Sequence, residues 1–490
     1  MRAGYAYLAI PAALFLVGWL RWWWAVPALA ALAVGFWRMW VQAPKVWVPA
    51  WSRRTVAVAA MVCVVLGVGV VFSGIGGISH QHWDHGWRNA IFEMLVAERW
   101  PVVLDSPLGG VPLTYYLGFW LPAALVGKAA GLVAGWAALL AWAGAGLAIL
   151  AVLVSGLLRR FAVWPVLVFA VFGGMDLVEK AVWGTADVFK SVGSVEFIDS
   201  ARLYGFTSFG DQWTTVFNQA LPAWILTVLV LSQRDNRSVV AVCALGAIEC
   251  PLPEVGLAVI VAVLMFWCTG GVVSAGQPAE TTGRSTGGRL SRAWARARAA
   301  AGGAATSQNA LVGAVGAVVF GSYFAATLNQ TALAVQLPQT PTDVARLAVF
   351  WVFEFGIMFA LIARPWRGSP LWWAALGTML VLPLLRVGAF NELNMRAVIP
   401  AQVVLYMMVC WTLAQAKPPW RSLRAVALAV ILALGSGSTL HTAVFHGRSS
   451  LRAIESVVQG TNWRVARQTL LARLVPSWRD DPTAVEPYWR

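Results

Sequence analysis

Residues 132–158 read LVAGWAALLAWAGAGLAILAVLVSGLL, and Arg159 and Arg160 follow directly. The stretch contains no charged side chain and no proline. A helix rises 1.5 Å per residue, so about 20 apolar residues are enough to cross the roughly 30 Å of hydrocarbon in a bilayer. The sequence therefore predicts a membrane-spanning helix over residues 132–158.

The rest of the chain repeats this pattern. Of its 490 residues, 59% are hydrophobic and 12% are charged, whereas a soluble domain has about half and a quarter. This composition excludes a water-soluble fold. We expect an all-α, polytopic bundle of about thirteen transmembrane helices. The predicted spans are 5–20, 25–41, 55–76, 132–158, 161–176, 217–232, 237–250, 253–272, 310–328, 344–362, 369–386, 397–415 and 422–440.

The net charge is +15. The Arg and Lys residues responsible for it lie mainly in the connections between apolar blocks, not along one face of a soluble domain. Under the predicted helix count, the connections that contain Arg38, Arg53, Arg159, Arg234 and Arg364 fall on one side of the membrane. The positive-inside rule makes that side the cytoplasm. We therefore expect a multi-pass protein of the plasma membrane with a cytoplasmic N-terminus and an extracytoplasmic C-terminus. Membrane lipid is an expected partner, and nucleic acid is not.

The same reading divides the chain into five regions. They are two additional N-terminal transmembrane helices (1–54), a core with outer loops 77–131 and 175–217 (55–272), a basic flexible cytoplasmic linker (273–309), the C-terminal transmembrane helices (310–440) and a short extracytoplasmic tail (441–490).

The first outer loop predicts interfacial helices. From Trp83, apolar residues recur at helical spacing as far as Leu95, which gives one apolar face. Such a helix lies in the plane of the interface. A second apolar run, 111–122, could cross the bilayer, but Arg159 and Arg160 would then emerge outside. We therefore expect a second interfacial helix there.

These features together resemble a known family. A membrane helix, an acidic residue just outside it, interfacial helices, the element 112–116 (PLTYY) and a long helix that returns to Arg159 and Arg160 are similar to the GT-C superfamily of membrane glycosyltransferases. The resemblance covers mainly residues 55–160. It implies a GT-C-like fold that transfers a sugar from a polyprenyl-phosphate donor to an extracytoplasmic glycan, lipid or protein acceptor. The chain departs from the family in its two extra N-terminal helices and in Asp84-His85, which replaces the usual pair of acids.

The resemblance assigns the catalytic role to Asp84, as a base on the acceptor hydroxyl. Arg88 is one helical turn away, so the alternative is that Asp84 opens a helix and pairs with Arg88. Asp84, His82 and His85 could also bind a divalent metal ion, because imidazole and carboxylate are ordinary ligands. Solvated interfacial histidines are the alternative, so the need for a cofactor stays open.

Three further acids stand near predicted helix ends. Asp176 follows a span, where several GT-C families place a second acid, and it is our other catalytic candidate; an ordinary loop acid is the alternative. Glu249 and Glu254 flank a proline-broken tip between two spans. Acids so close to a membrane are costly unless wet or paired, so we expect at least one of them to face a polar cavity.

The segment 386–400 is the other polar cluster at the outer edge. Arg396 is predicted to open a helix, so that its guanidinium and nearby backbone N–H groups could bind the phosphate of a lipid-linked donor, with Arg386 assisting. Binding of bulk phospholipid is the alternative, and Glu392 could simply neutralise Arg396. The remaining supporting candidates are Asn394, Tyr115 and Tyr116.

Other functions have different requirements. A transporter or lipid flippase needs polar residues along a path through the membrane, and the predicted helix centres are almost free of charge. A membrane assembly factor would need no chemistry at Asp84 or Arg396. The sequence has no Walker loop and no dinucleotide fingerprint, which disfavours ATP-driven chemistry. A glycosyltransferase is the leading hypothesis, and a transporter or flippase without glycosyl transfer is the alternative.

Overall fold

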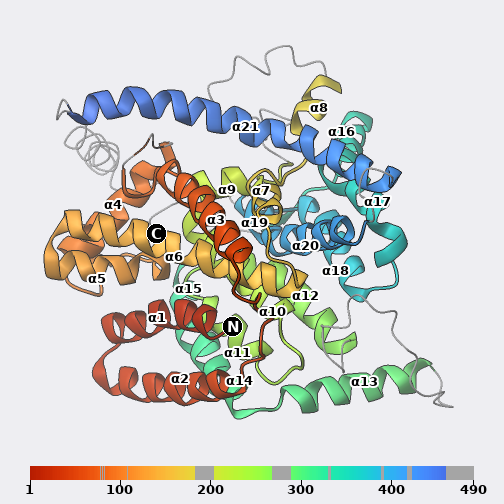
Figure 1. Cartoon of the computed structure of the whole chain (residues 1–490). Coiled ribbons are helices and arrows are strands. Elements are labelled where there is room, and N and C mark those ends of the chain that lie inside the picture. The colour runs from red at the N-terminus through yellow and green to blue at the C-terminus, as the bar shows by residue number, and fades with distance from the viewer. Residues whose placement is uncertain are drawn as a thin grey trace.

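The computed structural model describes residues 1–77, 79, 81, 83–106, 109–182, 204–267, 289–328, 333–387, 391–416 and 422–458, and it is mostly helical (Figure 1). The helices are α1 (Arg2–Trp19), α2 (Trp22–Gln42), α3 (Arg53–Val71), α4 (Trp83–Ala97), α5 (Leu121–Ala130), α6 (Leu132–Leu158), α7 (Trp164–Ala170), α8 (Asp176–Val182), α9 (Phe209–Thr215), α10 (Phe217–Leu231), α11 (Val239–Gly246), α12 (Pro251–Trp267), α13 (Arg289–Ala304), α14 (Ser307–Ala314), α15 (Gly321–Leu328), α16 (Pro341–Trp351), α17 (Ile357–Trp366), α18 (Pro370–Val381), α19 (Glu392–Ala397), α20 (Ile399–Gln415) and α21 (Leu423–Val458).

Short elements connect these helices. The π-helical turns η4 (Val315–Phe320) and η5 (Val352–Gly356) join α14 to α15 and α16 to α17, and the 3-10 turn η2 (Gly118–Trp120) leads into α5. Strands β1 (Val103–Ser106) and β2 (Gly109–Pro112) form one antiparallel pair, and β3 (Leu333–Val335) and β4 (Leu385–Val387) form another.

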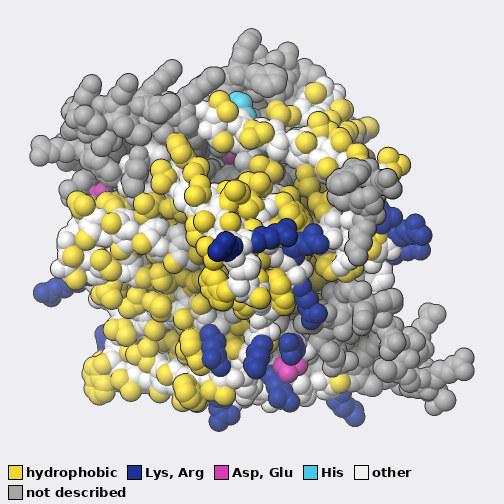
Figure 2. Space-filling model, in the orientation of Figure 1, with side chains coloured by type: hydrophobic (Ala, Val, Ile, Leu, Met, Phe, Trp, Pro, Cys, Tyr) yellow, Lys and Arg dark blue, Asp and Glu magenta, His cyan; other side chains and the backbone are white. Residues whose placement is uncertain are grey.

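Long apolar helices make this chain a membrane protein. Within the described residues, seven helical segments are long and apolar enough to cross a bilayer. They are Trp22–Gln42, Arg53–Val71, Leu132–Leu158, Ser307–Ala325, Pro341–Trp366, Glu392–Gln415 and Leu423–Val444. Helix α3 buries only Val62 and Val70 and exposes Met61, Val64 and Val68, as expected of a lipid-facing surface. Hydrophobic side chains cover much of the face in Figure 2.

The predicted count of thirteen spans stays a prediction. The longest helix in the range 161–176 is α7, whose seven residues extend about 10 Å at 1.5 Å per residue. The range 237–250 contains the eight residues of α11. Neither helix is long enough to cross a bilayer by itself.

Helix α10 lies at the centre of the bundle. Each of its residues from Phe217 to Leu231 is buried, and it packs against α6, α20, α11 and α12. A helix that is apolar all round is stable only when neighbours cover every face. Helix α10 also contacts η2 and α9. The core around it therefore fixes the positions of these elements together with α12 and α20.

Several of the predicted cytoplasmic connections meet at one end of the bundle. The Arg38 guanidinium donates to the Ser307 hydroxyl over 2.7 Å, and the Thr306 hydroxyl donates to the Arg237 carbonyl over 2.6 Å. Val46 packs at Gly156, close to the end of α6. Figure 2 shows Lys and Arg side chains in the middle of the face, at its sides and in its lower part.

The segment 77–131, which was predicted to be the first outer loop, contains one of the two predicted interfacial helices but not the other. Helix α4 begins at Trp83, as predicted. The run 111–122 is not a helix: strand β2, an extended turn and η2 precede α5, which begins at Leu121. Pro122 stands at the start of α5, where the missing N–H of a proline costs no hydrogen bond. Glycine-rich β2 instead pairs with β1, and the Leu113 N–H donates to the Val102 carbonyl over 2.9 Å.

Two region boundaries also differ from the prediction. The last part of the predicted flexible linker is helical, because α13 occupies Arg289–Ala304. The predicted last span and the first part of the tail form one helix, α21, which continues to Val458. The rest of the tail and residues 268–288 lie outside the described residues.

Candidate functional site

Asp84 lies in the first turn of α4 and pairs with Arg88. One carboxylate oxygen of Asp84 is 3.5 Å from the Arg88 Nη2 atom. The Asp84 side chain is 25% exposed, whereas that of Arg88 is 5% exposed. The predicted i,i+4 pair is therefore confirmed, and it presents Asp84 toward solvent while Arg88 points inward.

Arg88 and His85 both contact Phe217 at the start of α10. The Arg88 guanidinium carbon is 5.9 Å from the centre of the Phe217 ring, and the His85 ring centre is 5.7 Å from it. His85 is buried, so it is not the solvated interfacial histidine of the alternative hypothesis. His82 lies outside the described residues, and the metal site predicted with Asp84, His82 and His85 stays a prediction.

Tyr115 and Tyr116 form an aromatic pair beside two arginines. Their ring centres are 3.7 Å apart. Burial raises the pKa of the Tyr115 hydroxyl, and the nearby Arg88 and Arg396 guanidinium groups offset this in part. Burial also raises the pKa of Tyr116 well above its ordinary value. Both phenols therefore stay protonated near neutral pH and can donate hydrogen bonds.

Arg396 is held by an acid and an aromatic ring. Its guanidinium hydrogen bonds to the Glu392 carboxylate one turn earlier in α19, which confirms the predicted neutralisation. The guanidinium carbon lies 5.8 Å from the centre of the Tyr116 ring, within cation–π range. The prediction that Arg396 opens a helix is wrong. It stands in the last turn of α19, because Asn391 with a φ of 50° starts that helix.

These contacts bring together residues from distant parts of the chain. We call Asp84, Arg88, Tyr115, Tyr116 and Arg396 the basic–aromatic site. The loop with the two tyrosines is fixed from α15, because the Tyr323 hydroxyl accepts from the Tyr115 N–H and donates to the Tyr115 carbonyl, each over 2.9 Å. Two arginines act on Tyr115, and each is also paired with one acid. Their guanidinium groups are donors of the kind that bind phosphate.

Two other predicted residues lie near this site. Arg386 is the central residue of β4, opposite Ala334 of β3, and α19 packs against β4. The Asn394 side chain donates to the Gly205 carbonyl over 3.2 Å, so it fixes the loop that precedes α9. Asn394 thus has a structural contact, and Arg386 stands on the strand that leads toward Arg396.

Glu249 lies behind the tyrosine loop rather than in a wet cavity. A side chain at Gly118 would meet the Glu249 Cγ atom at 2.7 Å, and the Gly118 N–H donates to the Ile248 carbonyl over 3.3 Å. Glu249 is fully buried, and neither of its carboxylate oxygens has a hydrogen-bond partner among the described residues. Such a group is costly to keep charged. Glu254 lies against Gly246, the last residue of α11.

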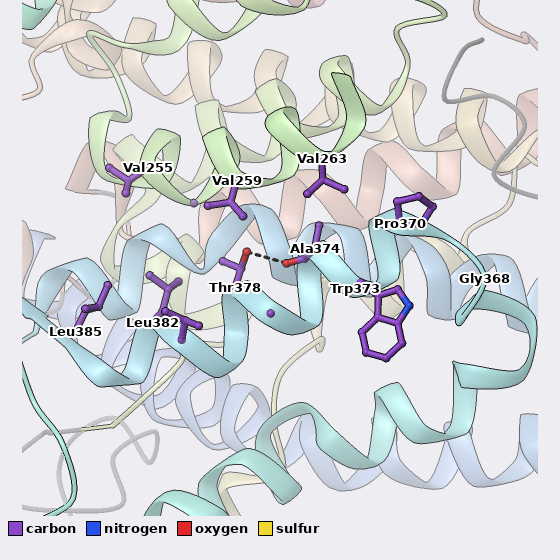
Figure 3. A pocket seen from close by; sticks show the side chains of 13 residues that line it. Val255, Val259, Val263, Gly368, Pro370, Trp373, Ala374, Thr378, Leu382 and Leu385 are labelled. Atoms are coloured by element: carbon purple, nitrogen blue, oxygen red, sulfur yellow. Dashed lines mark hydrogen bonds between the residues drawn. The ribbon is translucent and has the colours of Figure 1, made fainter. Parts of the chain in front are cut away.

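An apolar groove separates α12 from α18. It has a volume of about 610 Å³, which is in the range of ligand pockets. Val255, Val259 and Val263 of α12 face Ala374 and Thr378 of α18 across it (Figure 3). The Thr378 hydroxyl is already used, because it donates to the Ala374 carbonyl over 2.8 Å. The Trp373 indole N–H likewise donates to the Arg367 carbonyl over 2.9 Å. The lining is therefore almost entirely apolar, which suits a hydrocarbon chain.

The groove ends close to the predicted phosphate-binding residues. Leu385 lines it at one end (Figure 3) and is followed in sequence by Arg386. Gly256, which also lines it, packs against the backbone of Ala397, the residue after Arg396: a Cβ at Gly256 would lie 1.8 Å from the Ala397 carbonyl oxygen. The groove therefore reaches the point where α12 packs against α19, the helix that contains Arg396.

The second catalytic candidate lies in a different cluster. Asp176 and Glu179 of α8 and Glu354 of η5 each place a carboxylate oxygen within 4.8 Å of the other two. All three side chains are buried. We call these residues the acid cluster. At an effective dielectric constant of about 20, two unit charges 4.8 Å apart repel each other by about 3.5 kcal/mol. Full ionisation of all three acids is therefore unfavourable, and protons or a cation would relieve the repulsion.

The sequence reasoning missed Glu179 and Glu354. Glu354 stands in the middle of the predicted span 344–362, and an ionisable residue inside a span is a functional candidate by default. The position of Glu354 was visible in the sequence, and it shows that the centre of at least one predicted span contains an ionisable side chain. Glu179, in contrast, was recognisable only as a residue one turn after Asp176, because nothing in the sequence indicates that η5 faces α8.

Comparison of the chain with protein-family models, with curated proteins and with solved structures finds no match. The function must therefore be argued from the geometry of these residues.

Proposed function

We propose that this protein is an integral membrane glycosyltransferase that transfers a sugar from a polyprenyl-phosphate donor to an extracytoplasmic glycan, lipid or protein. The observation that supports it most is the basic–aromatic site, where Arg88 and Arg396 approach Tyr115 and Asp84 is paired with Arg88. An anion-binding group, a partly exposed carboxylate and an adjacent apolar groove are the parts that such a reaction requires.

Each part has a role in this scheme. The groove between α12 and α18 takes the hydrocarbon chain, and Arg396 with Arg386 binds the donor phosphate. Asp84 removes the proton from the acceptor hydroxyl as its oxygen attacks the anomeric carbon. The bond between that carbon and the phosphate oxygen breaks, and the polyprenyl phosphate leaves with the electron pair. Tyr115 and Tyr116 position Arg396 and donate hydrogen bonds.

The topology belongs to the same proposal. The chain would lie in the plasma membrane with about thirteen spans, in a GT-C-like fold. Its N-terminus would be cytoplasmic and its C-terminus extracytoplasmic, because the basic connections gather at one end of the bundle. The basic–aromatic site would then face the extracytoplasmic side.

The proposal is tested by sugar transfer in proteoliposomes. The purified protein is incubated with labelled polyprenyl-phosphate sugars and hydroxyl acceptors, and transfer is compared for wild type, Asp84→Asn and the control Asp235→Asn. Asp235 forms an exposed ion pair with Arg237, so its substitution should leave transfer unchanged. Loss of a general base typically costs 10² to 10⁴ in rate, so we expect Asp84→Asn to lose at least about 100-fold. Equal rates for Asp84→Asn and wild type would contradict the assigned role.

The acid cluster favours a second candidate, a transporter or flippase coupled to a cation. Glu354 lies within the candidate span Pro341–Trp366, beside two further carboxylates, as in proton and ion relays of membrane transporters. Flux of protons or of a divalent cation into liposomes, abolished by Glu354→Gln and independent of any sugar donor, would favour this function over glycosyl transfer.

A further inference from the structure

The acid cluster joins two elements that are far apart in the sequence. Asp176 and Glu179 occupy one face of the first turn of α8. Glu354 belongs to η5, the π-helical turn between α16 and α17. The Met175 N–H donates to the Phe353 carbonyl over 3.2 Å, so the two elements are in direct backbone contact. π-helical turns are frequent at functional sites, and this one directs a carboxylate at two others.

Glu354 is buried and lies close to the two acids of α8, although it comes from a different helix. Its side chain is 2% exposed, and its Oε2 atom has no hydrogen-bond partner among the described residues. The carboxylate packs directly against Gly174. A side chain at that position would collide with it, because a Cβ would lie 1.9 Å from Oε2. A buried acceptor that lacks a donor, close to two further carboxylates from another helix, is stabilised by a proton or by a bound cation.

We infer that Asp176, Glu179 and Glu354 form a binding site for a hard divalent cation of the Ca²⁺, Mn²⁺ or Mg²⁺ class. Carboxylate oxygens are the ligands that such cations prefer. Oxygens at 2.3–2.6 Å from one Ca²⁺ are at most about 5 Å apart, so ligand atoms within 4.8 Å of one another are close enough to share one ion after small side-chain shifts. Three oxygens leave other coordination positions for water or backbone carbonyls.

The cation site is separate from the basic–aromatic site. Residues 204–208 lie between them: Phe206 packs against Phe350 and Phe355 near the acid cluster, and the Gly205 carbonyl accepts from Asn394. A bound cation would hold α8 against η5 and thereby fix this connecting loop. The inference does not depend on glycosyl transfer, because cation binding is measured without any donor.

The test is a titration with Mn²⁺ followed by electron paramagnetic resonance. Full-length protein in phosphatidylcholine nanodiscs, whose zwitterionic headgroups attract Mn²⁺ only weakly, is titrated while the signal of free Mn²⁺ is recorded. We expect Mn²⁺ to bind at one saturable site per chain, and Ca²⁺ to displace it from that site. Glu354→Gln keeps the shape of the side chain and should weaken Mn²⁺ binding at least tenfold. Glu98→Gln, at an exposed position after α4, should leave it unchanged.

A second variant keeps the test decisive if Glu354→Gln fails to fold. Gly174→Ala retains all three acids but displaces the Glu354 carboxylate, and it should weaken Mn²⁺ binding several-fold. Gly67→Ala is the matched control, because nothing lies within 4 Å of a Cβ at that position. Absence of saturable binding to the wild type would overturn the inference. So would equal Mn²⁺ affinity in the wild type and in folded Glu354→Gln or Gly174→Ala.

Discussion

The basic–aromatic site and the acid cluster both place charged side chains inside a membrane protein, yet they do so in opposite ways. In the first, Asp84 is paired with Arg88 and Glu392 is paired with Arg396, and both acids remain partly exposed. In the second, three like charges converge in the interior. In the first site each acid has an arginine as its partner, whereas the second brings three acids close to one another. Substitutions should therefore change stability with opposite signs in the two places.

The largest effect on stability is expected at the paired site. Arg396→Met removes the partner of Glu392 and the cation above Tyr116, so a partly buried carboxylate is left uncompensated. Breaking a buried ion pair from one side costs about 3 kcal/mol, and thermal unfolding in detergent should show the loss. Arg237→Met is the control, since its pair with Asp235 is 66% exposed on the arginine side and exposed pairs contribute at most about 1 kcal/mol. Equal losses in both variants would remove the distinction.

A smaller effect of opposite sign is expected at the acid cluster. In buffer that contains a chelator, Glu354→Gln removes a carboxyl group that must either repel two other acids or take up a proton. The free energy of unfolding should therefore rise by about 2 kcal/mol. The same thermal unfolding measurement applies, with Glu98→Gln as the control. In excess Ca²⁺ the gain should shrink or reverse, because only the wild type keeps all three ligands. A lower stability of Glu354→Gln in chelator would contradict like-charge repulsion.

The smallest effect concerns pH. The unfolded chain ionises its tyrosines near pH 10, whereas burial raises the pKa of Tyr115 and Tyr116 in the folded state. The stability that these phenols provide is therefore fully present below about pH 10 and is lost as the pH rises through their folded-state pKa. The double variant Tyr115→Phe/Tyr116→Phe should unfold with a weaker pH dependence between pH 9 and 11. An unchanged slope would show that neither phenol is protected from ionisation.

The sequence was sufficient for features that depend on local pattern. Uncharged stretches such as 132–158 predict helices because only hydrogen-bonded helices satisfy the backbone in lipid, and α6 occupies that range. Helical spacing from Trp83 located α4, and the separation of four residues predicted the ion pair of Asp84 with Arg88. The sequence also offered Glu392 as the group that neutralises Arg396, and the two are paired. These predictions needed no knowledge of the tertiary structure.

Features that depend on contacts between distant segments were not predictable from one sequence. The apolar run 111–122 has the composition of a helix, but β2 is decided by pairing with β1. Arg396 precedes a predicted span, so a helix was expected to begin there. In the structure the helix begins earlier, because Asn391 adopts a left-handed backbone conformation directly before α19. The acid cluster needs α8 to meet η5, which no local pattern indicates.

Helix α21 gives the acid cluster a place in the order of synthesis. It packs against α8, and a Cβ at Gly435 would lie 2.8 Å from the Gly173 carbonyl oxygen and 3.1 Å from that of Gly174, the glycine on which Glu354 rests. Chains fold from the N-terminus as they are made, so α8 and α16 leave the ribosome well before α21. The loop that contacts Glu354 cannot reach its final packing before α21 has been made, so synthesis of residues 423–458 sets the earliest moment at which this packing is complete.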